Sequence, residues 1–333
     1  MNGRERYDAT LRGEPVDHLA RIPILMQRAA EHIGASYGNY AADWRVLTAA
    51  HLRSAADFGL DLLSVMSDPY RECSAFGGEV EFPPAGPKCP RPPLAAARDL
   101  ALLAHPDPAT SPRLASCLAA IRRFRDEGRG AYSILGWVEG PAAEAADLRG
   151  VTDFLLDLHD DPAFAGALMD RCMEAGIAFA AAQIAAGADT IGIGDAIASQ
   201  ISPRMYERLV LPRERVLAAA IRARGARVRM HICGNIAHLL PGLASLPLDI
   251  LDVDHLVDLA AVRARIPPPV ALAGNLDPVA EVRHGTPESI RAGVLRCYET
   301  AGNPYLVNAG CEIPPGTPDA NLHALCAPIP SRA

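Results

Sequence analysis

The sequence has no apolar run of membrane-spanning length and no excess of positive charge. Its 39 Asp and Glu residues outnumber 32 Lys and Arg residues, which leaves a formal net charge of −7. This balance argues against nucleic acid or an anionic membrane surface as the main partner. No cationic segment followed by an apolar core opens the chain, so we expect neither a secretory signal nor a membrane anchor. We therefore expect a cytoplasmic protein.

Two further motifs are missing. No GxGxxG fingerprint follows an early strand, which argues against a dinucleotide-binding fold. The eight cysteines are spread thinly over the 333 residues, and without a secretory signal they are expected to be thiols rather than a disulfide framework. Half of the residues are hydrophobic, which supplies a large core for either two domains or one barrel.

Short apolar segments alternate with helical patterns along the whole chain. Each segment is continuously apolar, as expected for strands of a sheet that is covered on both faces. The expected strands span residues 20–27, 61–66, 132–140, 188–195, 227–234, 248–254, 270–277 and 305–312. The expected helices span residues 44–58, 111–127, 151–187, 203–224, 236–246, 256–266 and 287–301.

Eight such repeats without a break in composition predict an α/β protein in which residues 1–333 form one domain, a single (β/α)8 TIM barrel. A doubly wound open sheet is the alternative. Residues 69–112 are rich in Pro and Gly, and we interpret them as an insertion between the second and third strands that covers the mouth or an end of the barrel.

Polar side chains collect where the expected strands end, which is where barrel enzymes carry their chemistry. His231 and Cys233 lie two residues apart at the end of the fifth strand, so they share a face. Cys311 stands far downstream at the end of the eighth strand. One imidazole and two thiols suit zinc and leave a coordination position open. The alternative is that the two cysteines are core residues.

The composition of this ligand set indicates which reaction it serves. Two thiolates and one imidazole give a zinc complex with a net charge near zero, which is a weak Lewis acid for hydrolysis. Such a complex is suited to binding a substrate thiol and lowering its pKa, because the resulting thiolate stays nucleophilic at neutral pH. The ligand set therefore favours alkyl transfer to sulfur over activation of water.

The chain resembles the uroporphyrinogen decarboxylase superfamily, and within it the cobalamin-dependent methyltransferases of the methylcobalamin:coenzyme M type. The resemblance runs nearly end to end. It rests on the segments at residues 4–18 (RERYDATLRGEPVDH), 136–141 (GWVEGP), 192–195 (GIGD), 201–203 (ISP), 231–235 (HICGN), 274–277 (GNLD) and 310–318 (GCEIPPGTP).

In that branch, the resemblance implies, zinc is bound by His231, Cys233 and Cys311 and activates a thiol that accepts a methyl group from a corrinoid. The chain has no Asp-x-His-x-x-Gly cobalamin motif, so the corrinoid is expected on a separate partner protein. The decarboxylase branch has an arginine-rich N-terminal segment, and residues 21–29 lack that pattern. A homodimer is compatible with these expectations.

Four other polar residues at strand ends are candidates for the site. Glu139 and Asp195 are expected to orient substrate or to supply a fourth zinc ligand, with capping of the following helices as the alternative. Asn275 and Asp277 share a face at the end of the seventh strand, and we expect one of them to touch the cofactor.

The sequence thus predicts a zinc methyltransferase that moves a methyl group between a protein-bound methylcobalamin and a small acceptor, with a thiol as the favoured acceptor. The residues do not decide the direction of transfer. Two alternatives stay open. One is a lyase that decarboxylates a tetrapyrrole without metal, and the other is a non-catalytic corrinoid-binding protein with a structural zinc.

Overall fold

Seven parallel strands form one curled sheet, in which each strand pairs with the next strand along the chain. The structure is a computed structural model and describes residues 1–331. The strands are β1 (Leu62–Ser64), β2 (Ser133–Glu139), β3 (Thr190–Gly194), β4 (Arg227–Ile232), β5 (Ile250–Val253), β6 (Ala271–Ala273) and β7 (Tyr305–Leu306). This order contradicts the doubly wound alternative, because a doubly wound sheet reverses its strand order at a switch point.

The first of the eight expected strands does not form a regular ladder. Arg21 makes a single parallel bridge to Val307, just beyond β7. On the other side, the Arg21 carbonyl accepts a hydrogen bond of 3.0 Å from the Asp61 amide, just before β1. The extended segment around Arg21 therefore lies between the two edge strands of the sheet.

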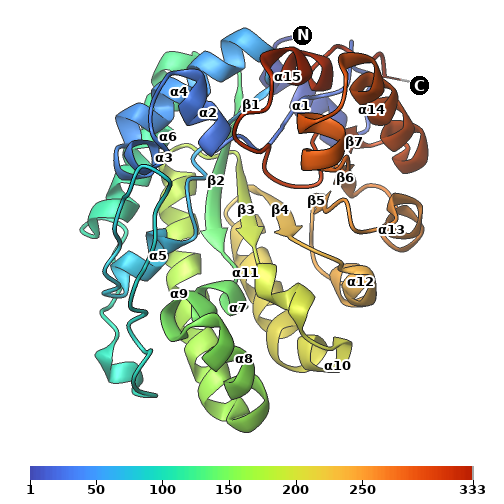
Figure 1. The fold of residues 1–333 in the computed structure, drawn as a ribbon. Coiled ribbons are helices and arrows are strands. Elements are labelled where there is room, and N and C mark those ends of the chain that lie inside the picture. Colours follow the sequence, from blue (N-terminus) through green and yellow to red (C-terminus); the bar gives the residue numbers. More distant parts are fainter. Residues whose placement is uncertain (332–333) are drawn as a thin grey trace.

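Helices surround the sheet (Figure 1). The α-helices are α1 (Gly3–Leu11), α2 (Gln27–His32), α3 (Tyr37–Ala42), α4 (Trp44–Phe58), α5 (Tyr70–Ala75), α6 (Pro112–Gly128), α7 (Pro141–Arg149), α8 (Val151–Asp160), α9 (Pro162–Ala186), α10 (Pro203–Met205), α11 (Leu211–Arg222), α12 (Leu240–Leu243), α13 (Leu259–Arg265), α14 (Pro287–Ala301) and α15 (Asp319–Leu325). Three 3₁₀ turns are η1 (Leu100–Leu102), η2 (Ala196–Gln200) and η4 (Ala237–Leu239), and two π turns are η3 (Tyr206–Val210) and η5 (Pro278–Arg283). None of the helices within residues 1–331 is both long and apolar enough to cross a membrane.

Two of the expected helices, α4 and α14, have the bounds that the sequence predicts. The long helix expected over residues 151–187 is broken into α8 and α9. Pro162 has no amide hydrogen to continue α8, and the Asp161 side chain caps the new helix by accepting from the Phe164 amide at 3.1 Å. The helix expected over residues 203–224 is likewise divided, into α10, η3 and α11.

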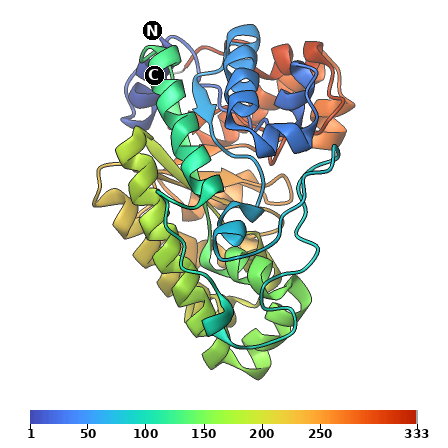
Figure 2. The same ribbon diagram turned by 90° about the vertical axis from the view of Figure 1, so that its left-hand side faces the viewer.

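Residues 76–111 run as long irregular loops down one side of the molecule, between α5 and α6 (Figure 2). One antiparallel bridge joins Glu81 to Lys88. Farther along, the Arg149 side chain at the end of α7 donates to the carbonyls of Leu94 and Ala95. These loops therefore pack against α7.

The two faces of the sheet belong to two different apolar clusters. Leu135 and Trp137 belong to a small inner cluster, whereas Ile134 and Val138 belong to the large cluster shared with the helices. This alternation follows from the two-residue period of a strand. The same alternation in β4, where Val228, Met230 and Ile232 face the helices, leaves Arg229 and His231 for the inside.

Candidate metal centre

His231, Cys233 and Cys311 lie together, although the first two stand at the end of the central strand β4 and Cys311 follows the edge strand β7. The Nε2 atom of His231 is 3.2 Å from Sγ of Cys233 and 3.6 Å from Sγ of Cys311. The two sulfurs are 3.6 Å apart. Within residues 1–331, no other group of three or more His, Cys, Asp or Glu side chains is close enough to share a metal ion.

This triangle fits a tetrahedral zinc ion. With Zn–S and Zn–N bonds of about 2.3 and 2.0 Å, tetrahedral geometry needs about 3.8 Å between two sulfurs and about 3.6 Å between sulfur and nitrogen. The observed separations of 3.6, 3.6 and 3.2 Å are all within about half an ångström of those edges. The three side chains would therefore need only small shifts to bind such an ion.

Buried polar groups lie behind the imidazole of His231. Nδ1 of His231 has no hydrogen-bond partner and lies 3.7 Å from Oδ2 of Asp252 in the neighbouring strand β5. Asp252 is itself held by the buried guanidinium of Arg229 and by Nδ2 of Asn308, which donates to its Oδ1 at 2.8 Å. A carboxylate behind a ligand imidazole orients the ring and makes it a stronger ligand.

The two thiols differ in acidity because they share one hydrogen bond. The bond from Cys233 and the neighbouring His231 hold the pKa of Cys311 at about 4 despite burial. The same contact with Cys311, together with burial, raises the pKa of Cys233. Burial lowers the pKa of His231, but the contact with Cys311 and the charge of Asp252 outweigh it, so that this pKa is raised. The same contact thus makes Cys311 the more acidic thiol and Cys233 the less acidic one.

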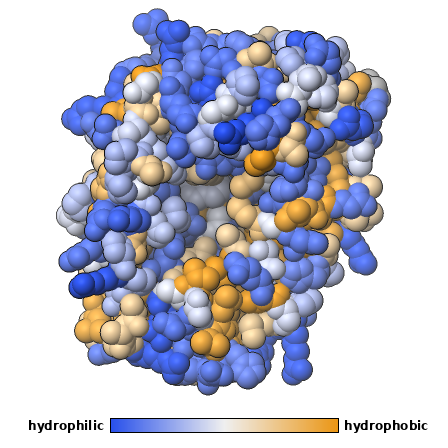
Figure 3. Space-filling view, viewed as in Figure 1, coloured by the Kyte–Doolittle hydropathy of each residue, from blue (hydrophilic) through white to orange (hydrophobic). Residues whose placement is uncertain are grey.

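The three ligands line a cavity of about 250 Å³. Figure 3 shows the molecule hollowed near the centre of the face where Figure 1 draws the tips of β2 and β3. Most of its wall is apolar, and these lining residues are Ile24, Met26, Met66, Pro69, Trp137, Gly194 and Ala196. The remaining lining residues are the acids Asp68, Glu139 and Glu312. A small ligand at the metal would therefore be enclosed mainly by apolar groups.

Glu139 lies on the wall of this cavity. The indole Nε1 of Trp137 donates to its carboxyl at 2.9 Å. Burial and the charge of Glu72 raise the pKa of Glu139 well above its usual range. Gly192 and Gly194 in the neighbouring strand make room for the Trp137 ring, because a Cβ atom at either position would overlap it.

Asp195 is fully buried behind the cavity and does not line it. Its carboxylate accepts hydrogen bonds from the amides of Ala142 at 3.3 Å and Ala143 at 2.8 Å, in the first turn of α7. Burial raises its pKa to about 7 although these bonds oppose the shift. The contacts of Asp195 thus match the helix-capping alternative.

Asn275 and Asp277 also contact protein rather than the cavity. Nδ2 of Asn275 donates to the carbonyls of Asp254 at 3.2 Å and Val257 at 2.7 Å. Asp277 caps η5, where its Oδ1 accepts from the amides of Val279 and Ala280. Both residues hold loops at the same end of the sheet as the metal site.

Sequence reasoning did not single out Arg229, Asp252 or Trp137. Arg229 precedes His231 by two residues in an otherwise apolar strand, so the two-residue period contained a signal that it faces inward. The pairing of Asp252 with Arg229, by contrast, depends on the register of β4 against β5. In this register Arg229 lies opposite Ile250 and His231 lies opposite Asp252, so Asp252 is offset by two residues from the arginine that it pairs with.

Comparisons with known proteins show the family of this chain. Residues 2–329 match the family described as uroporphyrinogen decarboxylase (URO-D). The methylcobamide:CoM methyltransferase MtbA of Methanosarcina mazei is 26% identical over 97% of this chain and 96% of that protein. The uroporphyrinogen decarboxylase of Synechococcus sp. is 27% identical over 96% of this chain and 95% of that protein.

Among solved structures, a methyltransferase from Methanosarcina mazei superimposes with a TM-score of 0.89 at 25% identity, over 98% of both chains. The family therefore contains both methyltransferases and decarboxylases on one α/β fold. By the extent of these matches, the chain belongs to the uroporphyrinogen decarboxylase family, and its relatives include methylcobamide:CoM methyltransferases.

Proposed function

We propose that this protein is a zinc-dependent methyltransferase that moves a methyl group between a protein-bound corrinoid and a small thiol. The observation that carries the proposal is the triangle of His231, Cys233 and Cys311 in the wall of a mainly apolar cavity. We take the extended segment around Arg21 as an irregular eighth strand that completes a barrel. The triangle then lies at the face where barrel enzymes carry out their chemistry.

When bound, zinc would hold the sulfur of the acceptor as a thiolate at neutral pH. The chain would supply the ligands, the carboxylate of Asp252 at 3.7 Å from Nδ1 of His231, and a mainly apolar wall around the sulfur. The corrinoid would supply the methyl group and would keep the electron pair of its cobalt–carbon bond, while the acceptor sulfur would form the new bond to carbon. The thiol proton leaves to solvent, and the reverse reaction uses the same atoms.

The other predicted site residues take different roles in this proposal. Glu139 contacts the substrate, because its carboxyl lies on the cavity wall. Asp195 is a positioning residue that holds the first turn of α7. Cofactor contact by Asn275 and Asp277 stays a prediction, and their hydrogen bonds favour a role in shaping the loops that receive the corrinoid. The separate corrinoid protein, the homodimer and the cytoplasmic location also stay predictions.

The contacts of the N-terminal arginines argue against the decarboxylase alternative. Arg21 is paired with Asp61 at 3.0 Å. Arg28 is paired with Asp319 and also donates to the Thr317 carbonyl at 2.8 Å. Neither guanidinium lines the cavity, so neither is placed to grip the carboxylates of a porphyrinogen.

The test is a zinc determination on the purified protein, followed by incubation with methylcobalamin and a panel of thiols. We expect about one zinc per chain. We also expect thiol-dependent formation of cob(I)alamin, which is monitored by its absorption spectrum. Cys311→Ala should lose zinc and at least about a hundredfold in rate, because two ligands hold zinc poorly. The matched control is Cys326→Ala, because Cys326 is a buried thiol outside the cavity. This variant should keep its zinc and its reaction rate.

Metal-free wild-type protein with full activity would contradict the proposal. A Cys311→Ala variant that unfolds, while its Cys326→Ala control stays folded, would instead favour a structural zinc.

A further inference from the structure

We infer that the methyl acceptor of this enzyme has an uncharged, apolar tail, and that thiols with an anionic tail are poor substrates. The inference deepens the proposed function and rests on it for the thiol group that binds at the metal. It concerns the part of the substrate that extends from the metal into the cavity, and it is argued from the residues that line this cavity.

The cavity has no cationic side chain to neutralise an anionic tail. Among residues 1–331, no Lys or Arg lines it, and its one imidazole belongs to the metal ligand His231. Its other ionisable groups besides the cysteine ligands are three acids, Asp68, Glu139 and Glu312. A carboxylate or sulfonate placed against this wall would lose hydration without gaining a cationic partner, which is unfavourable.

The three acids are also poorly placed to attract a cationic tail, because each is already engaged. Both carboxylate oxygens of Asp68 accept hydrogen bonds from the Arg113 guanidinium, at 3.0 and 2.6 Å. The carboxyl of Glu139 accepts from the indole of Trp137 at 2.9 Å. The carboxyl of Glu312 accepts from the Gln27 amide at 2.9 Å.

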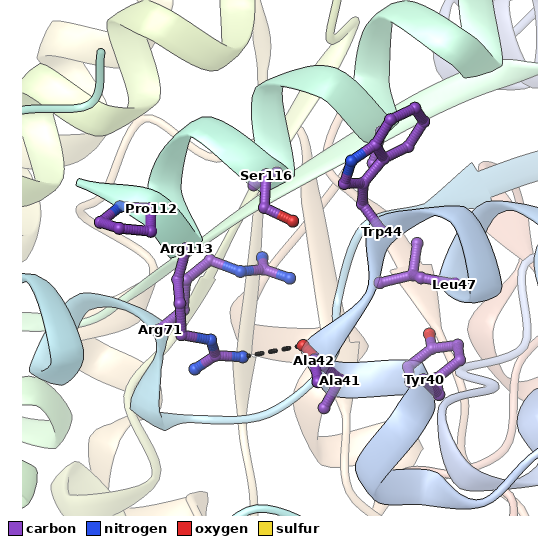
Figure 4. A pocket seen from close by; sticks show the side chains of 11 residues that line it. Tyr40, Ala41, Ala42, Trp44, Leu47, Arg71, Pro112, Arg113 and Ser116 are labelled. Carbon is purple, nitrogen blue, oxygen red and sulfur yellow. Dashed lines mark hydrogen bonds between the residues drawn. The ribbon is translucent and has the colours of Figure 1, made fainter. Parts of the chain in front are cut away.

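The arginine that pairs with Asp68, together with Arg71, lines another cavity. Arg71 and Arg113 line a smaller space of about 110 Å³, next to Tyr40, Trp44 and Ser116 (Figure 4). One nitrogen of Arg113 donates to the Ala41 carbonyl at 3.2 Å, and Arg71 donates to the Val65 carbonyl at 2.9 Å. Asp68 lines the metal cavity and takes up the charge of Arg113, so this cation is not available to a ligand at the metal.

An apolar tail, in contrast, would meet complementary surfaces. Ile24, Met66 and Trp137 line the cavity, and each belongs to the inner apolar cluster of the sheet. Burial of an alkyl tail against them is favourable in proportion to the area removed from water. With about 250 Å³ of space, the cavity admits a small alkyl or aryl thiol.

The experiment compares thiols of similar size that differ in the charge of the tail. The zinc-loaded full-length protein is assayed with methylcobalamin and 1-propanethiol, 2-mercaptoethanol or 2-mercaptoethanesulfonate (coenzyme M). In parallel, each thiol is titrated into the cobalt(II)-substituted protein, where sulfur-to-cobalt charge-transfer bands report binding without turnover. We expect kcat/KM and affinity for 1-propanethiol to exceed those for the sulfonate by at least about tenfold, which corresponds to about 1.4 kcal/mol.

Two variants test whether charge at the wall causes this preference. Met26→Arg adds a cation at a partly exposed lining position, and Asp68→Asn removes the carboxylate that neutralises Arg113 without adding bulk. Each should shift the ratio of the two kcat/KM values toward the sulfonate by at least about tenfold. Leu102→Arg adds the same charge at an exposed position outside the cavity and is the control.

The outcomes separate this inference from the proposed function. If 2-mercaptoethanesulfonate reacts and binds as well as 1-propanethiol or better, the inference is wrong while thiol methylation stands. If no thiol reacts and none produces charge-transfer bands, the proposed function fails and the inference with it. If Met26→Arg and Asp68→Asn both fold but leave the ratio unchanged, wall charge does not set the preference and the inference is overturned.

Discussion

At the scale of single residues, Asp252 has the most consequential position outside the ligand set. It lies behind the imidazole of His231 and also neutralises the buried Arg229. The contact with His231 concerns the candidate metal site, and the pair with Arg229 concerns the stability of the fold. A substitution of Asp252 should therefore change both metal affinity and the free energy of unfolding.

We predict that Asp252→Asn weakens zinc binding by about ten- to a hundredfold, because the ring loses its orienting carboxylate. We also predict a loss of about 3 kcal/mol in the free energy of unfolding, because Arg229 keeps a buried charge without a counter-ion. Competition with a chromophoric chelator measures the first effect and urea unfolding the second. Asp249→Asn is the control, because Asp249 pairs with Arg222 at the other end of β5. Equal loss of zinc affinity in both variants would contradict the assigned role.

The ligand set shows what sequence reasoning can reach at this scale. His231 and Cys233 are two residues apart at a strand end, so the period of a strand was sufficient to place both on one face. Glu139 was likewise expected at the site and lies on its wall. The contacts of Asp195, Asn275 and Asp277 could not be derived in this way, because each depends on a loop or helix end that arrives from another part of the chain.

At the scale of secondary-structure elements, β3 is shaped by a side chain of its neighbour. The ring of Trp137 in β2 occupies the space over Gly192 and Gly194. The Gly-x-Gly pattern that resembles part of a nucleotide-binding turn is therefore explained by packing against an aromatic ring.

We predict that Gly192→Ala lowers the free energy of unfolding by about 1–3 kcal/mol, because its methyl group would displace the ring. Since that ring lines the cavity, the KM for a thiol should also change. Gly176→Ala in α9 is the matched control, because a methyl group there would meet its neighbours at ordinary distances of 3.8 and 4.0 Å. Alanine also favours helix over glycine by about 1 kcal/mol. Thermal unfolding measures the stability of both variants. A Gly192→Ala variant as stable as wild type would refute the packing argument.

The packing of α3, α4 and α6 contains a buried histidine that should make stability depend on pH. His51 in α4 is hydrogen-bonded to the hydroxyl of Tyr40 at 2.8 Å and packs edge-on against Phe124. Burial lowers the pKa of His51 from 6.5 to about 4. Because the folded-state pKa is the lower one, the stabilising contribution is complete above pH 6.5 and is lost as the pH falls toward 4.

We predict that wild-type protein loses about 3 kcal/mol more stability than His51→Gln between pH 7 and pH 4. Urea unfolding at a series of pH values measures this difference. His159→Gln, at a side chain that is 82% exposed, should behave like wild type. Parallel curves for wild type and His51→Gln would show that folding does not shift the pKa of His51.

At the scale of the whole molecule, the metal site is small relative to the apolar core that surrounds it. The outer cluster extends from Leu19 to Cys326 and joins the sheet to its helices, and the described cysteines form no disulfide. The fold therefore has sources of stability that do not involve the zinc ligands.

We predict that removal of zinc by a chelator abolishes methyl transfer but leaves a folded protein. Loss of bound metal should lower stability by about 3–4 kcal/mol if free zinc was about 100- to 1,000-fold above its Kd. Far-ultraviolet circular dichroism, thermal unfolding and activity before and after addition of zinc measure these effects. An unfolded metal-free protein that regains its structure with zinc would favour the structural-zinc alternative.

The amino-acid sequence by itself determined the parallel α/β architecture, the ends of several helices and the three candidate metal ligands. These features depend on local periodicity, on caps such as that of α14, and on the chemistry of single side chains. The tertiary structure decided the rest. It showed that the segment around Arg21 bridges the edge strands, that Asp252 lies behind His231, and that Arg71 and Arg113 line a different cavity. Such features depend on strand register and on contacts between distant segments, which local patterns do not specify.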